Sequence, residues 1–116
     1  MKRSFRLTRS TDIKRVRRSG KSYAHPLVVL YVLRSNAKLP QVCVTAGLAV
    51  GNAVKRNRAK RLLKAAMSQL LPITAPGADL LLIARAPLAV VKVDQVRAAL
   101  SSLLNRAGLL IQHYDA

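Results

Sequence analysis

A cluster of basic side chains in the middle of the sequence is the strongest candidate for a binding function. Six of the ten residues from 55 to 64 are lysine or arginine, and Asn57 stands between two arginines. Arginine binds phosphate oxygens through two parallel hydrogen bonds, and the asparagine amide both donates and accepts. This combination suits a nucleic acid: the cations contact phosphates, and Asn57 contacts a base edge, a 2′-hydroxyl or a hydrated metal ion.

The alternative reading of this cluster is a solvated helix face without a partner. Such faces usually mix charges, because acid–base pairs four residues apart offset the repulsion between cations. No acidic residue lies between positions 13 and 78, so each like-charged pair costs roughly 0.2–0.5 kcal/mol without compensation. We therefore interpret the cluster as a phosphate-binding surface.

Catalytic residues are much less evident than binding residues. Metal-assisted hydrolysis of a phosphodiester needs clustered carboxylate or histidine ligands. The only acidic residues are dispersed along the chain, at Asp12, Asp79, Asp94 and Asp115. We interpret His25 and His113 as surface or structural residues. The sequence therefore predicts no catalytic residue and no metal site in the protein alone.

The composition agrees with a polyanionic partner. The 116 residues carry a formal charge of +17, and 51% of them are apolar, which is enough for one domain with a core. No apolar run reaches about 18 residues, and no apolar segment of a signal peptide follows the basic start, so a cytoplasmic protein without a membrane partner is expected. A basic transit peptide within residues 1–21 stays open. The single Cys43 cannot form an internal disulfide and is expected in the core.

Apolar spacing predicts the elements that position the basic cluster. Helices are expected at 10–19, 52–71 and 94–107, and strands at 25–34, 41–50 and 79–85. Residues 1–9 are expected to form a flexible basic arm, and the tail 109–116 has no assigned structure. The order αββαβα in a single domain, 1–116, predicts an α+β (α/β sandwich) fold with one mixed sheet and helices packed against it.

The central helix is expected to separate apolar from basic residues. At 100° per residue, its apolar stripe comprises Ala59, Leu62, Leu63, Ala66, Met67 and Leu70. The opposite side, called the basic ridge below, comprises Asn57, Lys60, Arg61 and Lys64. Arg56 and Arg58 flank the ridge on either side.

The segment VGNAVKRNRAKRLLKAA, residues 50–66, closely resembles the signature of the bacterial ribonuclease P protein component. That signature is an Arg-Asn-Arg core preceded by Gly-Asn-Ala-Val and followed by Lys-Arg. A capped basic helix near the N-terminus, the strand VLY and the segment DLLLIARAPLA at 79–89 extend the resemblance over residues 5–107. Two departures stand out: Gly47-Leu48-Ala49 replaces a common Ser-Lys-Lys, and Ile13 and Arg17 replace aromatic residues.

The resemblance implies a function, partners and site residues. It implies an RNA-binding subunit of the tRNA-processing endonuclease ribonuclease P, in which the RNA subunit with Mg²⁺ performs catalysis. The partners would be that catalytic RNA and the 5′ leader of precursor tRNA. The implied RNA-docking residues are Lys55, Arg56, Asn57, Arg58, Lys60, Arg61 and Lys64. The implied leader-binding residues are Ile13, Arg17, Leu27, Val29 and Tyr31. Without the aromatic residues, leader contact is expected either to be weaker or to rely more on Arg17 stacking and charge.

The resemblance also implies an unusual left-handed β-α-β crossover around the basic helix, whereas about 98% of such crossovers are right-handed. Two other functions remain as alternatives. A ribosomal or ribosome-assembly RNA-binding protein would share the charge but not the signature. A protein-only nuclease is disfavoured by the dispersed aspartates.

Overall fold

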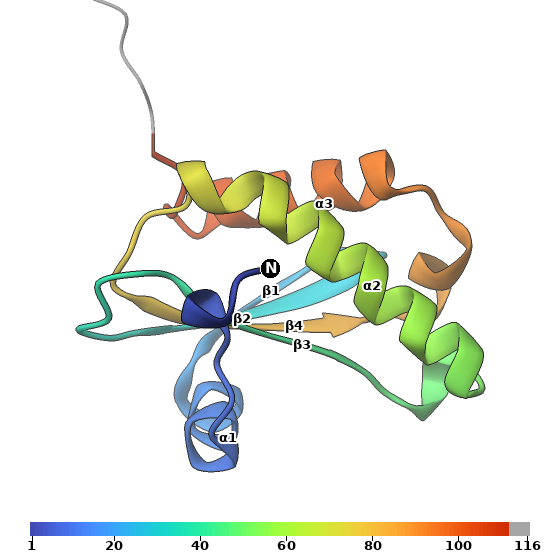
Figure 1. The fold of residues 1–116 in the computed structure, drawn as a ribbon, viewed down its shortest axis with the longest axis horizontal. Coiled ribbons are helices and arrows are strands. Elements are labelled where there is room, and N and C mark those ends of the chain that lie inside the picture. The colour runs from blue at the N-terminus through green and yellow to red at the C-terminus, as the bar shows by residue number, and fades with distance from the viewer. Residues whose placement is uncertain (112–116) are drawn as a thin grey trace, which may run out of the picture.

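A computed structural model describes residues 1–111 of the chain (Figure 1). Its main elements are α1 (Ser10–Ser19), β1 (Lys21–Ala24), β2 (Val28–Arg34), β3 (Gln41–Ala46), α2 (Ala53–Leu70), β4 (Ala78–Ala84) and α3 (Val93–Arg106). Four short 3-10 turns accompany them: η1 (Arg3–Phe5), η2 (Leu48–Val50), η3 (Leu71–Ile73) and η4 (Ala86–Val90). One mixed sheet with three helices confirms the predicted α+β class.

The strands form one sheet in the order β1-β2-β4-β3. β2 is antiparallel to β1 and β4, whereas β3 and β4 are parallel. Because α2 connects β3 to β4, the expected β-α-β unit around the basic helix is present; its left hand stays a prediction. Alternation along β2 sends Val28, Leu30 and Val32 to one face, and Val29, Tyr31 and Leu33 to the other.

One face of the sheet, the helix-packed face, is covered by α2 and α3 (Figure 1). Leucines, valines, alanines and one methionine fill this layer, because the chain has almost no aromatic residues. The fully buried side chains include Leu30, Leu80 and Leu82 from the sheet, Leu63 and Met67 from α2, and Leu100, Leu103 and Leu104 from α3. Burying each such side chain contributes roughly 1.5–3 kcal/mol, so this layer carries most of the hydrophobic stabilisation.

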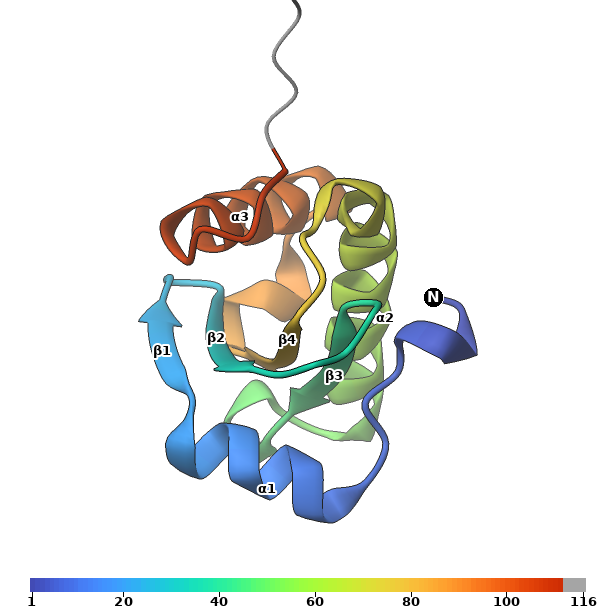
Figure 2. The same ribbon diagram turned by 90° about the vertical axis from the view of Figure 1, so that its left-hand side faces the viewer.

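The other face, called the α1 face, has much less cover. Figure 2 shows α1 running across the strands below the sheet. Val16 is its only buried residue, and it packs with Leu7 and Leu81 in a second, small core. Gly20 ends α1 where the chain touches β2: a Cβ there would lie 2.9 Å from the carbonyl oxygen of Val32. Only glycine fits this approach.

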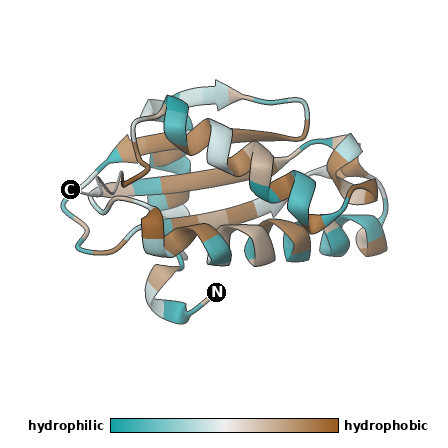
Figure 3. Ribbon diagram, turned by 90° about the horizontal axis from the view of Figure 1, so that it is seen from above, coloured by the Kyte–Doolittle hydropathy of each residue, from teal (hydrophilic) through white to brown (hydrophobic). Residues whose placement is uncertain are grey.

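Two sequence-based predictions about the sheet were wrong. β1 was missed because its residues, KSYA, form no apolar run, and Figure 3 colours this strand pale or teal beside the brown central strands. The order is therefore αβββαβα. The predicted strand 41–50 ends at Ala46, because the chain then turns through η2 toward α2. Gly51 completes that turn at a φ of 135°, which strongly favours glycine.

Both ends of the described chain are attached to the fold. In the predicted basic arm, residues 1–9, the Leu7 amide donates a 2.9 Å hydrogen bond to the Val42 carbonyl at the edge of β3. In the predicted tail, Leu109 is buried and Leu110 pairs with Thr74; residues 112–116, with His113 and Asp115, lie outside the described part. No helix within residues 1–111 has the length and apolar content needed to cross a membrane.

Candidate nucleic-acid interface

α2 presents the basic ridge because its opposite side is anchored in the core. As predicted, the Asn52 side chain caps the helix: its Oδ1 accepts a 3.0 Å hydrogen bond from the Lys55 amide. The buried residues of α2 are Ala59, Leu63, Ala66, Met67 and Leu70. Leu62, expected on the same stripe, is half-buried. The helix rotation is thus fixed by packing, and the basic side must face outward.

The structure brings the four ridge residues together. Asn57 and Arg61 are exposed, whereas Lys60 and Lys64 are half-buried. With Val54, these four side chains line a shallow groove of about 430 Å³. Lys55 is exposed one turn ahead of them. Within residues 1–111, the salt bridges engage only Arg15 and Arg97, so the ridge cations have no acidic partner there.

The two arginines beside the ridge have different environments. The Nε of Arg58 donates a 2.8 Å hydrogen bond to the Ala89 carbonyl, which attaches η4 to α2. Arg56 lines a small cavity with Ala46 and Ala53. Its Nε is buried and meets no hydrogen-bond acceptor among residues 1–111. A buried N–H without a partner is unfavourable for the folded state.

A second groove, of about 610 Å³, lies between α1 and the α1 face of the sheet and is called the α1 groove below. Its helical wall consists of Ile13, Lys14, Arg17 and Arg18, and its sheet side of Cys43, Val44, Thr45 and Leu81. The wall thus carries three cations, and the sheet side carries none. Such a groove can hold a strand with phosphates on one side and bases on the other.

Two of the five predicted leader-binding residues line this groove, and two more lie on the same face of the sheet. Ile13 and Arg17 form its wall, and the Arg17 guanidinium lies 5.3 Å from the ring centre of Tyr31, within cation–π range. Val29 is half-buried on the same sheet face. Leu27 lies elsewhere: it precedes β2 and packs against the core of the helix-packed face. Leu27 does not share the face of Val29 and Tyr31, because the alternation of side chains applies only within the strand and Leu27 lies before it.

The basic ridge and the α1 groove adjoin at the edge strand β3. α2 packs along β3, and the Lys64 charge reaches Cys43 on the other side of that strand. Burial raises the pKa of the Cys43 thiol, and the Lys64 charge partly opposes this rise. Cys43, expected in the core, is therefore half-buried at the groove. The two cationic surfaces therefore lie on either side of the edge strand β3.

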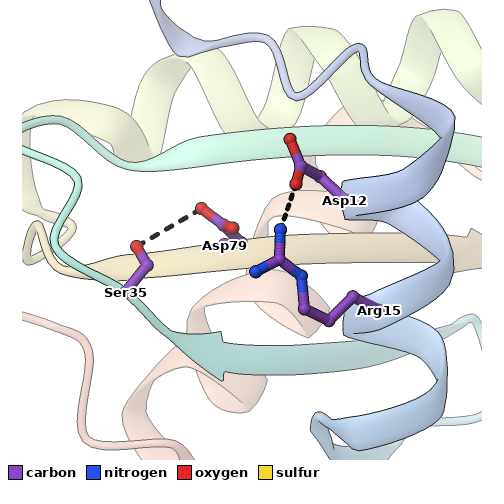
Figure 4. Close-up of polar contacts among 4 residues, drawn as sticks. All are labelled: Asp12, Arg15, Ser35 and Asp79. Atoms are coloured by element: carbon purple, nitrogen blue, oxygen red, sulfur yellow. Dashed lines mark hydrogen bonds and ion pairs between the residues drawn. The ribbon is translucent and has the colours of Figure 1, made fainter.

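The three described aspartates are held in local contacts. Asp12 forms an ion pair with Arg15 of the same helix, and the hydroxyl of Ser35 donates to Asp79 at 3.4 Å (Figure 4). Asp94 lies 3.5 Å from Arg97. Burial raises the pKa of Asp79, and the nearby Asp12 charge raises it further. No three potential metal-ligating side chains of residues 1–111 converge.

His25 lines neither the shallow groove of the basic ridge nor the α1 groove, and its contact is a structural one. Its Nδ1 accepts a 3.0 Å hydrogen bond from the Leu27 amide, which fixes the turn into β2. This agrees with its interpretation as a structural residue.

Comparison with known proteins identifies the family. The family model for ribonuclease P matches residues 1–108. The chain belongs to the ribonuclease P protein family. It is similar to the ribonuclease P protein component of Herpetosiphon aurantiacus, with 36% identity over 109 residues covering 94% of this chain and 89% of the relative. The component of an Exiguobacterium species is 34% identical over 107 residues, covering 92% and 93%.

Solved ribonuclease P proteins share the fold. The Staphylococcus aureus protein aligns with a TM-score of 0.80 at 23% identity, covering 91% of this chain and 97% of that one. The Thermotoga maritima protein aligns with a TM-score of 0.78 at 24% identity, covering 87% and 96%. The family model and the sequence relatives favour this family over the ribosomal alternative.

For this member of the ribonuclease P family, sequence reasoning missed part of the α1 groove. Lys14 and Arg18 were not predicted as groove residues, although their spacing from Arg17 already places them near one wall. Thr45 and Leu81 gave no signal, because their position depends on the pairing of β3 with β4. The register between distant segments decides which strand residues line the groove.

Proposed function

We propose that this chain is the RNA-binding subunit of ribonuclease P, docking on the catalytic RNA and holding the 5′ leader of precursor tRNA. It would thereby assist the endonucleolytic cut that gives mature tRNA 5′ ends. One observation carries the proposal: the basic ridge of α2 and the cationic wall of the α1 groove adjoin across β3. One chain can therefore contact two RNA segments at once.

The basic ridge is the proposed docking site for the catalytic RNA. Arg61 and Asn57 extend outward without acidic neighbours, and Lys60 and Lys64 stand beside them. Each phosphate neutralised by such cations releases counterions, so affinity should fall steeply as salt rises. Lys55, which is exposed, and Arg56, which is partly exposed, would add phosphate contacts at the head of the helix.

The α1 groove is the proposed site for the single-stranded leader. Lys14, Arg17 and Arg18 would contact its phosphates, and its bases would face the sheet. Tyr31 supplies a ring for stacking, already paired with the Arg17 guanidinium. Ile13 and Val29 add apolar contacts. We leave Leu27 out of the site because it packs in the opposite core.

We assign the chemistry to the RNA subunit and Mg²⁺. Asp12 and Asp94 each form an ion pair, and Asp79 accepts a hydrogen bond, at three separate places. Among residues 1–111, no three potential metal ligands lie close together. Mg²⁺ prefers several oxygen ligands together with phosphates, which a folded RNA provides. The cytoplasmic location expected from the sequence belongs to this proposal as well.

Reconstitution tests the proposal. The purified chain, the catalytic RNA and precursor tRNA would be combined in every pairing, at low salt with Mg²⁺. Cleavage at the mature 5′ end is expected only where the catalytic RNA is present, with the protein increasing the rate at low Mg²⁺. The variant Asp12→Asn/Asp79→Asn should support cleavage as well as the wild type. Cleavage by RNA-free protein that this variant lacks would refute the proposal.

A further inference from the structure

One end of the molecule carries few charges although the chain has 21 cations. Residues 39–54 and 86–91 contain no charged side chain. Besides the edge strand β3, these segments include η2, η4 and the first turn of α2, which pack against one another. Figure 1 shows this end beyond the strands, on the side away from α1. A surface with few charges therefore lies directly at the head of the most basic helix.

Three large apolar side chains stand out from this end. Leu48 is 82% exposed, Val54 74% and Val90 78%. We call these three residues the apolar corner. The fold does not need them for its core, because Val50 and Leu88 of the same turns are the residues buried beneath. Apolar side chains that stay in contact with water add no hydrophobic stabilisation to the folded chain.

The apolar corner is held in place by specific bonds. The Arg58 guanidinium binds the Ala89 carbonyl at 2.8 Å, next to Val90. The Asn52 cap fixes the first turn of α2, where Val54 lies. The Val50 and Gly51 amides donate to the carbonyls of Gly47 and Leu48, which closes η2. The corner is thus a preformed surface.

The corner is also continuous with the basic ridge. Val54 lines the same shallow groove as Asn57, Lys60, Arg61 and Lys64. Lys55 directly follows Val54, and Arg58 lies four residues after it, about one helical turn further along α2; both are exposed. An apolar centre beside cations matches a nucleotide, whose base is flat and weakly hydrated and whose phosphate is charged.

We propose that the apolar corner binds an unpaired base of the RNA that docks on the basic ridge. This inference rests on the proposed function. Proteins recognise folded RNA largely through bases that have left the helix and pack against side chains. The base would cover Leu48 and Val54, and its phosphate would lie toward Lys55. A second copy of the chain fits less well, because it would bring the cations of two +17 molecules together.

The variants Leu48→Ser, Val54→Ser and their combination test this inference. Both side chains are exposed, so the fold should be kept; circular dichroism and thermal unfolding would check it. Leu39→Ser is the matched control, because Leu39 is also partly exposed, at 42%, but lies in the loop between β2 and β3. Affinity for the catalytic RNA would be measured over a series of salt concentrations, together with chemical probing of unpaired RNA bases.

The double variant should bind the catalytic RNA about tenfold more weakly, since it exposes apolar surface that the complex buries. The salt dependence should not change, because no phosphate contact is lost, whereas Arg61→Ala should reduce it. At least one unpaired base should lose protection in the double variant but not in Leu39→Ser.

Three results would overturn the inference. The first is unchanged affinity and base protection in the double variant while Arg61→Ala still weakens docking, which leaves the proposed function intact. The second is self-association of the wild type in sedimentation that the double variant abolishes, which would assign the corner to a second copy. The third is no binding of the catalytic RNA by the wild type, which would remove the proposed function as well.

Discussion

The two faces of the sheet differ in how completely helices cover them. On the helix-packed face, α2 and α3 bury Leu80 and Leu82 fully. On the α1 face, a single helix crosses the strands, and Ile83 and Val29 stay half-buried. Adjacent residues of β4 therefore belong to different environments. The difference suggests a division of tasks: one face stabilises the fold, and the other stays open for a ligand.

The same division exists within α2. Its inner side is apolar and buried, whereas the basic ridge on its outer side lacks any acidic partner among residues 1–111. Repulsion along the ridge opposes folding, so the helix depends on the helix-packed core for its stability. Stability and RNA binding should therefore respond to different substitutions.

The largest expected effect comes from the core of the helix-packed face. Leu82→Ala should lower the free energy of unfolding by about 2–5 kcal/mol, because it leaves a cavity in a fully buried layer. Ile83→Ala, one residue further along β4, should cost clearly less, because its side chain is only half-buried. Urea unfolding of both variants measures the difference. Equal losses in the free energy of unfolding would mean that the two faces of the sheet contribute equally to stability.

Arg61→Ala should have the next largest effect, on binding rather than on stability. Loss of a charge-assisted hydrogen bond should weaken docking on the catalytic RNA by about 1.5–3 kcal/mol. The salt dependence of binding should also become shallower, because fewer counterions are released. A salt series of RNA-binding titrations gives both quantities. An unchanged affinity and slope would reduce the ridge to a solvated face.

Arg58→Ala is the informative control for Arg61. Its Nε bonds the Ala89 carbonyl, so its loss should lower thermal stability as well as RNA affinity, whereas Arg61→Ala should leave stability unchanged. If both variants unfold like the wild type, the bond to η4 does not contribute to the fold.

The smallest expected effect concerns Asp79 on the α1 face. Burial raises the pKa of this carboxyl, so the folded state holds its proton more tightly than the unfolded state. Stability should therefore fall slightly as pH rises through the range above the usual pKa of an aspartate. The side chain at this position in the variant Asp79→Asn cannot titrate. The stability of this variant relative to the wild type should therefore be higher across that pH range than at lower pH. Unfolding of both proteins would be measured over a pH series. If the stabilities of the wild type and the variant change in parallel with pH, this prediction is wrong.

The basic ridge could be predicted from the sequence because it depends on local spacing. The stripe from Ala59 to Leu70 fixes the rotation of α2, and Asn52 marks its start. β1 could not be predicted, since a short polar strand is defined only by pairing with β2. Leu27 was misplaced because it lies just outside β2, where alternation no longer applies.

The environments of the two flanking arginines were also beyond the sequence. Arg56 and Arg58 look equivalent in the motif, yet Arg58 bonds a carbonyl 31 positions away, and the Arg56 Nε is buried beside β3. Contacts between distant segments decide such roles. The same holds for Cys43, which is at the α1 groove because β3 pairs in parallel with β4.

The most direct test of the division between the two RNA surfaces is holoenzyme affinity for tRNA with and without a leader, at one salt concentration. Tyr31→Ala should weaken binding of leader-containing precursor by about 1–3 kcal/mol if a base stacks there, and leave mature tRNA binding unchanged. Arg61→Ala should lower holoenzyme assembly whichever tRNA is present. An equal loss for both tRNAs in Tyr31→Ala, or a loss of thermal stability that explains it, would contradict the account.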